Sequence, residues 1–454
     1  MAVTVSAAFG FLLAAGVKWP LLFGLLVIGG LGLVGLQRPF LFLALFLVLR
    51  PLLDRFSENR AVLTGSVSIN VAGLLAIVFI GVSVLVLAVR RPPGHSRAAG
   101  SFAAVLLVSA FAAAHSYVSL RSSVGTGVLL SELARLGALT AIYILAVHVA
   151  GTSSRAGTLF VIVGLAGVVP ALDGLYQWAH GIPVAADLTI GRISGTFSGP
   201  NPFGQYLAVV ALLLMAIPAD RLQPLVRLAA IAPVLAALVG TFSRSGWILF
   251  AAGALLLGWK HRRRAVVSIL VLCVALVTAV PVLRHRVISG DLRRQAGTGS
   301  VEVPSSFQWR MDTWRALMRK YMENPLLGFG LRSAAVVNPR QVLLPGQAQL
   351  AGYDPHNSVV KLLVEGGPAL LLAWGVLLAV IIRRMRSLAH EDWELAWASR
   401  TLYVLWAVIV FVGLTSDDPL VATAMLGGML ALTGAVEGAH EHLRQTAASK
   451  TTGD

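Results

Sequence analysis

Apolar runs separated by short polar segments make up most of this chain. A helix needs about 17 to 25 residues to cross the hydrocarbon core of a bilayer, and several of the runs reach that length. Backbone groups in lipid must be hydrogen-bonded within the protein, which favours helices for such runs. We therefore expect an all-α, polytopic membrane helix bundle of about 12–14 transmembrane helices, the lower number applying if short early runs merge. The runs fall at about 5–17, 20–36, 39–53, 67–89, 101–118, 129–150, 157–178, 203–218, 225–242, 245–259, 265–283, 357–383, 399–416 and 419–436.

One long polar segment interrupts this pattern, at residues 284–356. Within it, apolar residues recur at helical spacing from Phe307 to Tyr321 among basic residues, and Asn324-Pro325 would end the helix. We expect an amphipathic helix that lies on the membrane surface, closes over a cavity or simply covers the bundle. The predicted divisions are a transmembrane bundle at 1–283, an extracytoplasmic loop at 284–356, C-terminal transmembrane helices at 357–436 and a cytoplasmic tail at 437–454.

Composition supports a membrane protein, since 57% of the residues are hydrophobic, 12% are charged and the mean hydropathy is +0.81. The formal net charge is +16, but most basic residues lie in short loops, where they set orientation and contact anionic lipid headgroups. Membrane lipids are therefore expected partners, and nucleic acid is not. Cys273 is the single cysteine, which excludes a disulfide within the chain. The run at 5–17 is interpreted as an uncleaved first span, because no basic segment precedes it.

The placing of arginine and lysine among the loops predicts the orientation. With the N-terminus in the cytoplasm, the basic clusters at 90–97, 260–264 and 383–386 fall on the cytoplasmic side, as the positive-inside rule requires. Both termini are then cytoplasmic, and helix parity puts the 284–356 loop outside.

Two short segments of the predicted outer face contain Gly-Thr-Phe-Ser beside an arginine, at 192–201 and 240–247. Arg244 lies between two apolar runs with almost no loop to keep it in water, and a guanidinium near hydrocarbon is costly enough to indicate function. The alternative for Arg244 and Arg192 is an arginine that reaches out to the headgroups. Together the two would form a fork for a diphosphate, because guanidinium groups bind phosphate oxygens in bidentate fashion. Asn201 and Ser243 beside them are further candidates for substrate binding.

His356 ends the polar segment and begins the next apolar run. A neutral imidazole there can meet a substrate at the membrane surface, and histidine is the usual general base near neutral pH. A purely structural histidine is the alternative. Asn357 could orient it, and both Asn357 and Arg310 are candidates for substrate binding. Lys361 and Glu365 are expected to pair, because they are four residues apart on one helix.

Carboxylates of the predicted outer face, such as Asp54, Glu58 and Asp354, form no Asp-X-Asp pair. We therefore expect a site without a metal, and we expect no cofactor. Gly328-Phe329-Gly330, which follows the amphipathic helix, indicates a tight backbone and not a phosphate loop.

In their order along the chain, these motifs resemble the O-antigen ligase and polymerase superfamily. The resemblance rests on Arg-X-X-Gly-Thr-Phe…Asn at 192–201, Thr-Phe-Ser-Arg-Ser-Gly at 241–246, Arg310…Trp314…Asn324-Pro325…Gly328-X-Gly330 and Pro355-His356-Asn357-Ser358…Glu365-Gly366-Gly367. It implies a GT-C-like glycosyltransferase of the bacterial cytoplasmic (inner) membrane, with its site on the outer, periplasmic face. The implied reaction is an inverting, metal-independent transfer of a glycan from an undecaprenyl-diphosphate carrier. By the same resemblance, Arg192 and Arg244 would bind the diphosphate and His356 would be the general base.

The resemblance leaves two acceptors open: a sugar of the lipid A core for a ligase, or another lipid-linked repeat unit for a polysaccharide polymerase. The Pro-His-Asn-Ser junction after one large outer loop resembles the ligases more closely, so we expect a ligase, with the polymerase as the alternative. A transporter or flippase for lipid-linked glycans would show charges spread through several spans and two similar halves, and the sequence shows neither. A structural membrane scaffold would not need Arg244.

Overall fold

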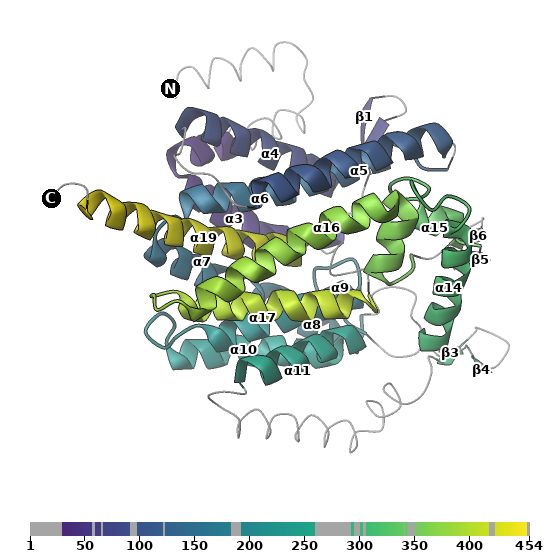
Figure 1. Ribbon diagram of the computed structural model, residues 1–454. Coiled ribbons are helices and arrows are strands. Elements are labelled where there is room, and N and C mark those ends of the chain that lie inside the picture. Colours follow the sequence, from purple (N-terminus) through teal and green to yellow (C-terminus); the bar gives the residue numbers. More distant parts are fainter. Residues whose placement is uncertain are drawn as a thin grey trace, which may run out of the picture.

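A computed structural model describes residues 30–56, 60–64, 67–90, 98–120, 123–182, 192–258, 292–294, 300–302, 306–339, 341–343, 350–352, 354–416 and 423–451. In this part of the chain, long helices run side by side in one bundle, and three two-stranded hairpins lie at one end of it (Figure 1). The expected helical membrane bundle is confirmed. The hairpins are small additions outside the bundle that hydropathy did not predict.

The elements are as follows. The helices are α3 (Pro39–Leu52), α4 (Val71–Arg90), α5 (Ala99–Ser119), α6 (Thr126–Val149), α7 (Ser153–Ala166), α8 (Val168–Ala179), α9 (Pro200–Ala216), α10 (Pro224–Gly240), α11 (Arg244–Gly258), α14 (Ser306–Tyr321), α15 (Ala334–Val337), α16 (Ser358–His390), α17 (Ala396–Gly413) and α19 (Thr423–Thr451). The antiparallel hairpins pair β1 (Arg60–Thr64) with β2 (Val67–Asn70), β3 (Leu292–Arg294) with β4 (Ser300–Glu302), and β5 (Gln341–Leu343) with β6 (Leu350–Gly352).

Length and composition make 6 helical segments of the described residues candidates for crossing a membrane. These are Ala72–Arg90, Ala99–Ser119, Thr126–Val149, Ser153–Ala179, Ser358–His390 and Ala396–Gly413, beside the shorter apolar helices Pro39–Leu52, Pro200–Ala216, Pro224–Gly240 and Arg244–Gly258. The runs at 5–17 and 265–283, and the first part of that at 20–36, lie outside the described residues. The total of about 12–14 spans therefore stays a prediction.

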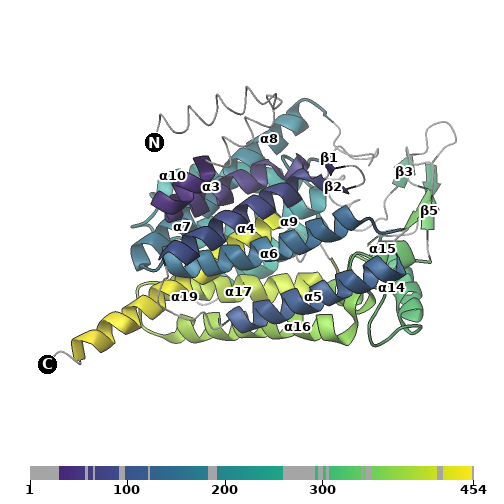
Figure 2. The same cartoon turned by 90° about the horizontal axis from the view of Figure 1, so that it is seen from above.

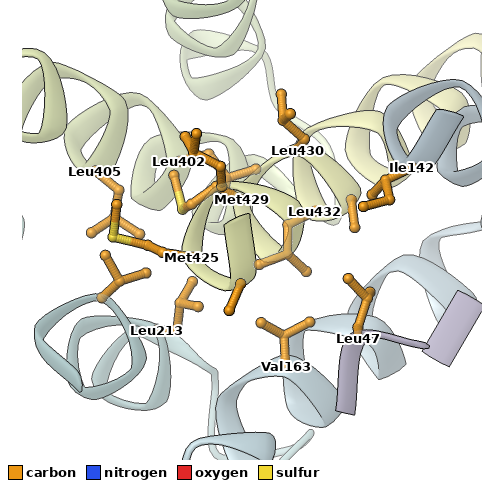
Figure 3. Close-up of a cluster of buried hydrophobic side chains, with 14 of the residues drawn as sticks. Leu47, Ile142, Val163, Leu213, Leu402, Leu405, Met425, Met429, Leu430 and Leu432 are labelled. Atoms are coloured by element: carbon orange, nitrogen blue, oxygen red, sulfur yellow. The ribbon is translucent and has the colours of Figure 1, made fainter. Parts of the chain in front are cut away.

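The core lies where α19 packs among helices from both halves of the chain. Figure 3 shows Met425 and Met429 of α19 beside Leu402 and Leu405 of α17 and Leu213 of α9, and all five side chains are buried. Lipid tails are as apolar as leucine, so close packing between helices, and not expulsion of water, is what holds such a core together.

The bundle has two chemically distinct ends. At the one we call the loop end, α9, α11 and α16 begin and α17 finishes, and α14, α15 and the hairpins lie beside it (Figures 1 and 2). At the other end, which we call the tail end, α19 finishes (Figure 2). There Arg221 donates a hydrogen bond to Ser153 O and forms an ion pair with Glu394. These two contacts join the starts of α7, α10 and α17. The predicted outer-face motifs all belong to segments of the loop end.

Helix α16 is broken inside the apolar run that predicted it. Gly366 (φ −144°, ψ 15°) and Gly367 (φ 65°, ψ −164°) leave the helical region, and Pro368 follows. Proline has no N–H, so Pro368 cannot donate to the carbonyl of Val364 four residues earlier. Phe329 N donates to Val364 O instead, at 2.7 Å. A residue of the predicted outer loop thus replaces a lost bond of α16.

The segment 327–331 is therefore docked between two helices. Leu331 N donates to Ala112 O of α5 at 3.0 Å, opposite the contact of Phe329 with α16. Gly328 and Gly330 have φ of 68° and 101°, which residues with a side chain rarely adopt. A Cβ on Gly328 would also lie 2.5 Å from Val364 O. The tight backbone predicted for this motif is confirmed.

The amphipathic helix is confirmed as α14, which ends at Tyr321 before Asn324-Pro325. Its apolar face packs on the first turns of α16, where Leu317 and Tyr321 join Val360 and Val364 in a buried cluster. α14 therefore covers the start of α16, next to His356.

Candidate active site

Arg192 is held inside the loop end by two other elements. Its Nε donates to Thr241 O at 2.9 Å, and its Nη2 donates to Asn201 Oδ1 at 2.7 Å. The residue is only 9% exposed. The structure thus joins the two Gly-Thr-Phe-Ser segments at this arginine and brings Asn201 to it.

The loop that carries Arg192 is clamped by Gln177 of α8, which is 4% exposed. Gln177 Nε2 donates to Gly195 O at 2.8 Å, and Gln177 Oε1 accepts from Ser194 N at 3.2 Å and Gly195 N at 3.1 Å. Arg55 also donates to Gly195 O, at 3.0 Å. One glutamine therefore satisfies three backbone groups of this loop and fixes its path.

Arg244 is the first residue of α11 and is partly buried. The preceding turn is tight, because Phe242 has a φ of 49° and Ser243 N donates to Thr241 Oγ1 at 3.2 Å. Ser243 Oγ accepts from Gly246 N at 3.3 Å, which satisfies one of the free N–H groups at the start of the helix. Ser243 therefore acts first as a helix cap, and its predicted contact with substrate stays a prediction.

The starts of α9 and α11 approach each other closely. A Cβ on Gly246 would lie 2.7 Å from the carbonyl carbon of Gly204, so no larger residue fits there. Next to this contact, Gln205 Nε2 donates to Ser245 Oγ at 2.9 Å and to Ser416 Oγ at 3.1 Å. Gln205 thereby links α9, α11 and the end of α17.

His356 lies just before α16 and is partly buried. Its φ is 51°, a conformation that costs a residue with a side chain about 1–3 kcal/mol and persists only where its surroundings enforce it. Such strain is concentrated at functional sites. The imidazole ring faces Trp309 of α14, with 6.0 Å between ring centroids.

Asn357 starts α16 and ties it to the end of α17. Its Oδ1 accepts from Val359 N at 2.9 Å and Val360 N at 3.1 Å, and its Nδ2 donates to Leu414 O at 2.7 Å. Ser358 Oγ donates to Ser416 O at 3.2 Å. Asn357 is thus a helix cap that fixes the backbone after His356.

Arg310 of α14 reaches the same place, because its Nη1 donates to Thr415 O at 2.9 Å. The end of α17 therefore receives bonds from α9, α14 and α16. All the predicted site residues lie in segments that these contacts join at the loop end: Arg192, Asn201, Ser243, Arg244, Arg310, His356 and Asn357.

Lys361 and Glu365 form the predicted pair, but the carboxylate nearest to Lys361 is that of Asp354. Lys361 Nζ lies 3.7 Å from Glu365 Oε1 and 2.7 Å from Asp354 Oδ1, two residues before His356. Helical spacing in the sequence could indicate Glu365 as a partner of Lys361. It could not indicate Asp354, because Asp354 lies before the helix begins. Lys361 and Glu365 are both buried.

Sequence reasoning missed Gln177, Gln205 and Ser416, which hold the site segments together. Gln205 lies four residues after Asn201 and so on the same face of α9, which was a usable signal. Gln177 and Ser416 carried no local pattern. Among the described residues, no group of three or more His, Cys, Asp or Glu side chains could hold a metal ion.

Comparison with known families finds a match over part of the chain. Residues 228–375 match the family described as O-antigen ligase. The resemblance to the O-antigen ligase and polymerase superfamily is confirmed. The matched stretch contains Ser243, Arg244, Arg310, His356 and Asn357, whereas Arg192 and Asn201 precede it. No curated protein matches the chain. The match supports a membrane glycosyltransferase of the O-antigen ligase and polymerase family.

Proposed function

We propose that this protein is an O-antigen ligase. It transfers a glycan from an undecaprenyl-diphosphate carrier to a hydroxyl of the lipid A core, at the outer face of the bacterial inner membrane. The acceptor oxygen attacks the anomeric carbon and forms the new glycosidic bond with inversion. The bond from that carbon to the diphosphate oxygen breaks, and the lipid diphosphate leaves with the electron pair.

The observation that carries this proposal is the hydrogen-bonded joining of the motif segments at one end of the bundle. Arg192 bonds to Thr241 and Asn201, Gln205 bonds to Ser245 and Ser416, and Ser358 bonds to Ser416 O. A diphosphate held near the arginines would therefore lie in the same region as His356.

The roles follow from the charge that develops during the reaction. A lipid diphosphate is already a good leaving group, so the protein must chiefly stabilise its growing negative charge and remove the acceptor's proton. Arg192 and Arg244 supply guanidinium groups, and α9 and α11 begin beside them with the positive ends of their dipoles. His356 takes the proton of the acceptor hydroxyl.

The test is transfer by purified protein in lipid nanodiscs supplied with a lipid-linked donor and a lipid A core acceptor. His356→Ala is expected to slow the chemical step by about 10²- to 10⁴-fold while donor binding is largely kept. Rates are divided by the amount of folded protein. A histidine that only shapes the loop would lower the yield of folded protein and leave the rate per folded molecule near normal, which would overturn the assignment.

We prefer a ligase to a polymerase because most basic side chains of α14 contact other groups of the protein. A polymerase must bind two lipid diphosphates, and the basic residues of α14 are candidates for the second. Three of the four donate to other groups of the protein: Arg310 donates to Thr415 O, Arg315 pairs with Asp312 and Lys320 pairs with Glu323. The fourth, Arg319, is exposed. Exposed ion pairs are weak, so this is a preference for the ligase and leaves the decision to experiment.

The deciding experiment supplies lipid-linked repeats with no other acceptor. A ladder of lengthened lipid-linked glycans would overturn the ligase proposal in favour of a polymerase. Transfer that occurs only when lipid A core is added supports it.

A further inference from the structure

The backbone around His356 is held from three sides. Asp354 is held by Lys361 at 2.7 Å, and the carbonyl of Pro355 accepts from Trp314 Nε1 of α14 at 2.6 Å. After the histidine, Asn357 is tied to Leu414 O at 2.7 Å. These anchors come from α16, α14 and the end of α17, and they enclose a residue with a φ of 51°. A strained conformation of this kind lasts only where its neighbours are fixed.

Of the residues that make these anchors, Lys361 is the one whose burial costs the most free energy. Its side chain is 9% exposed, and it lies in a segment apolar and long enough to cross a membrane. A lysine in such a place is expensive unless it is paired, and it marks a functional site by default. Asp354, at 35% side-chain exposure, stands at the border between the buried cluster and the outer loop. Lys361 therefore connects the membrane helix to the residue two positions before His356.

Other charges lie behind this pair and balance it. Glu365, 4% exposed, is 3.7 Å from Lys361. Glu132 and Arg135 of α6 pair with each other, and Arg332 interacts electrostatically with Glu132 and Glu365. Asp354, Glu365 and Glu132 thus lie in one cluster with Lys361, Arg135 and Arg332. The acidic and basic side chains of this cluster pair with one another, which fits a structural assignment.

The same cluster receives the docked outer segment. Arg332 follows directly after 327–331, the stretch that bonds to α5 and α16, and has a φ of 62°. The outer loop is therefore fixed to α16 at two places, at Phe329 on Val364 and at Asp354 on Lys361. His356 lies just beyond the second.

We propose that Lys361, through its ion pair with Asp354, is a positioning residue for His356. The pair sets the backbone of 354–356 so that the imidazole meets the acceptor hydroxyl. This inference rests on the proposed role of His356 as general base. Because Lys361 acts through Asp354, the two residues form one unit in catalysis.

Four variants test the inference in the nanodisc assay, with His356→Ala measured alongside. Lys361→Met and Asp354→Asn are each expected to lower kcat by about 10- to 100-fold, since a small misplacement of a reacting group slows the chemical step by such a factor. The KM for the lipid-linked donor should stay within about twofold of the original value. The double variant should be no slower than the slower single variant, because both changes break the same unit. Arg400→Met is the control, since it removes an exposed cation at the start of α17, away from His356, and should keep its kcat.

One further variant, Lys361→Arg, and the Asp354→Asn variant separate positioning from folding. Lys361→Arg keeps the charge and should recover most of the lost kcat, which a general loss of packing would not explain. Asp354→Asn changes a side chain that is one-third exposed, so it stays informative if Lys361→Met fails to fold.

The outcomes distinguish the two proposals. If His356→Ala is slow while Lys361→Met and Asp354→Asn keep full kcat per folded molecule, the positioning inference is overturned and the general base stands. Additive losses in the double variant would overturn the inference as well. If His356→Ala itself keeps full kcat, the general-base assignment fails first.

Discussion

At the scale of single residues, the two arginines differ in how the protein holds them. Arg192 uses Nε and Nη2 for bonds to Thr241 O and Asn201 Oδ1, so its guanidinium is oriented before any ligand arrives. Arg244 begins α11 at a helix N-terminus, where an anion is stabilised by free N–H groups. One arginine is preoriented by side-chain bonds, and the other is placed by its helix.

Arg244→Ala is expected to abolish glycan transfer while the protein still inserts, because the leaving diphosphate loses a bidentate partner. Arg244→Lys should recover little activity, since an ammonium lacks the planar fork. Arg192→Lys should fail for a further reason, because one ammonium cannot reproduce both existing bonds. Transfer rates per folded molecule are the measurement, and Arg400→Ala, an exposed arginine at the start of α17, is the control. Full activity in Arg244→Ala would exclude the diphosphate role.

Excess EDTA is expected to leave the transfer rate unchanged, because the charge of the diphosphate is met by arginine. Asp54, a carboxylate that a metal could otherwise use, is buried and paired with Arg50 at 2.8 Å. The measurement is the initial rate of purified protein before and after chelation. Inactivation that Mg²⁺ or Mn²⁺ reverses would show that the site needs a metal.

The residues that bear charge could be found from the sequence, and those that arrange them could not. Arg244 and His356 stand out because a charged or titratable group beside hydrocarbon is costly, whatever the fold. Gln177 and Gln205 are ordinary polar residues in helices. Their importance comes from partners 18, 40 and 211 positions away. Helical spacing could place Gln205 on the face of Asn201, but no local pattern reveals these partners.

At the scale of elements, the break in α16 decides how the segment 327–331 attaches to that helix. Hydropathy predicted one continuous span at 357–383, because apolar residues continue on both sides of the break. Gly366-Gly367-Pro368 could signal a break, but its consequence depends on Phe329, which lies outside the helix. By contrast α14 was predicted well, since its pattern is local and its ends carry recognisable signals.

Gly328→Ala is expected to loosen the outer loop from α16. The new Cβ would lie 2.5 Å from Val364 O and would need a φ of 68°, at a cost of about 1–3 kcal/mol. Melting temperature should fall, and transfer should fall with it, because 327–331 and His356 are anchored to the same helix. The control is Gly375→Ala in α16, where a Cβ meets nothing within 4 Å. A Gly328→Ala protein as stable and active as this control would show that the docking is dispensable.

At the scale of the whole molecule, each end of the bundle gathers residues from distant parts of the sequence. The loop end joins segments near 192, 241, 310, 357 and 415. The tail end joins Arg221, Ser153 and Glu394, and also Arg384 and His440. The sequence predicts the same grouping of these segments from helix parity, because each crossing reverses the chain. It could not show which helices are neighbours, since hydropathy carries no information on packing partners.

The orientation of these ends is the last prediction, and the proposed reaction depends on it. The positive-inside rule puts the tail end, with Arg155, Arg221 and the 383–386 cluster, in the cytoplasm. After Cys273 is replaced by alanine, single cysteines are introduced at the exposed positions Arg319 in α14 and Ala447 near the end of α19. A maleimide that cannot cross the inner membrane should label Arg319→Cys in intact cells and Ala447→Cys only after that membrane is opened. Because an acceptor carried on lipid A core is reached from the outer face, the reverse pattern would put Arg244 and His356 on the wrong side of the membrane and exclude the proposed ligase reaction.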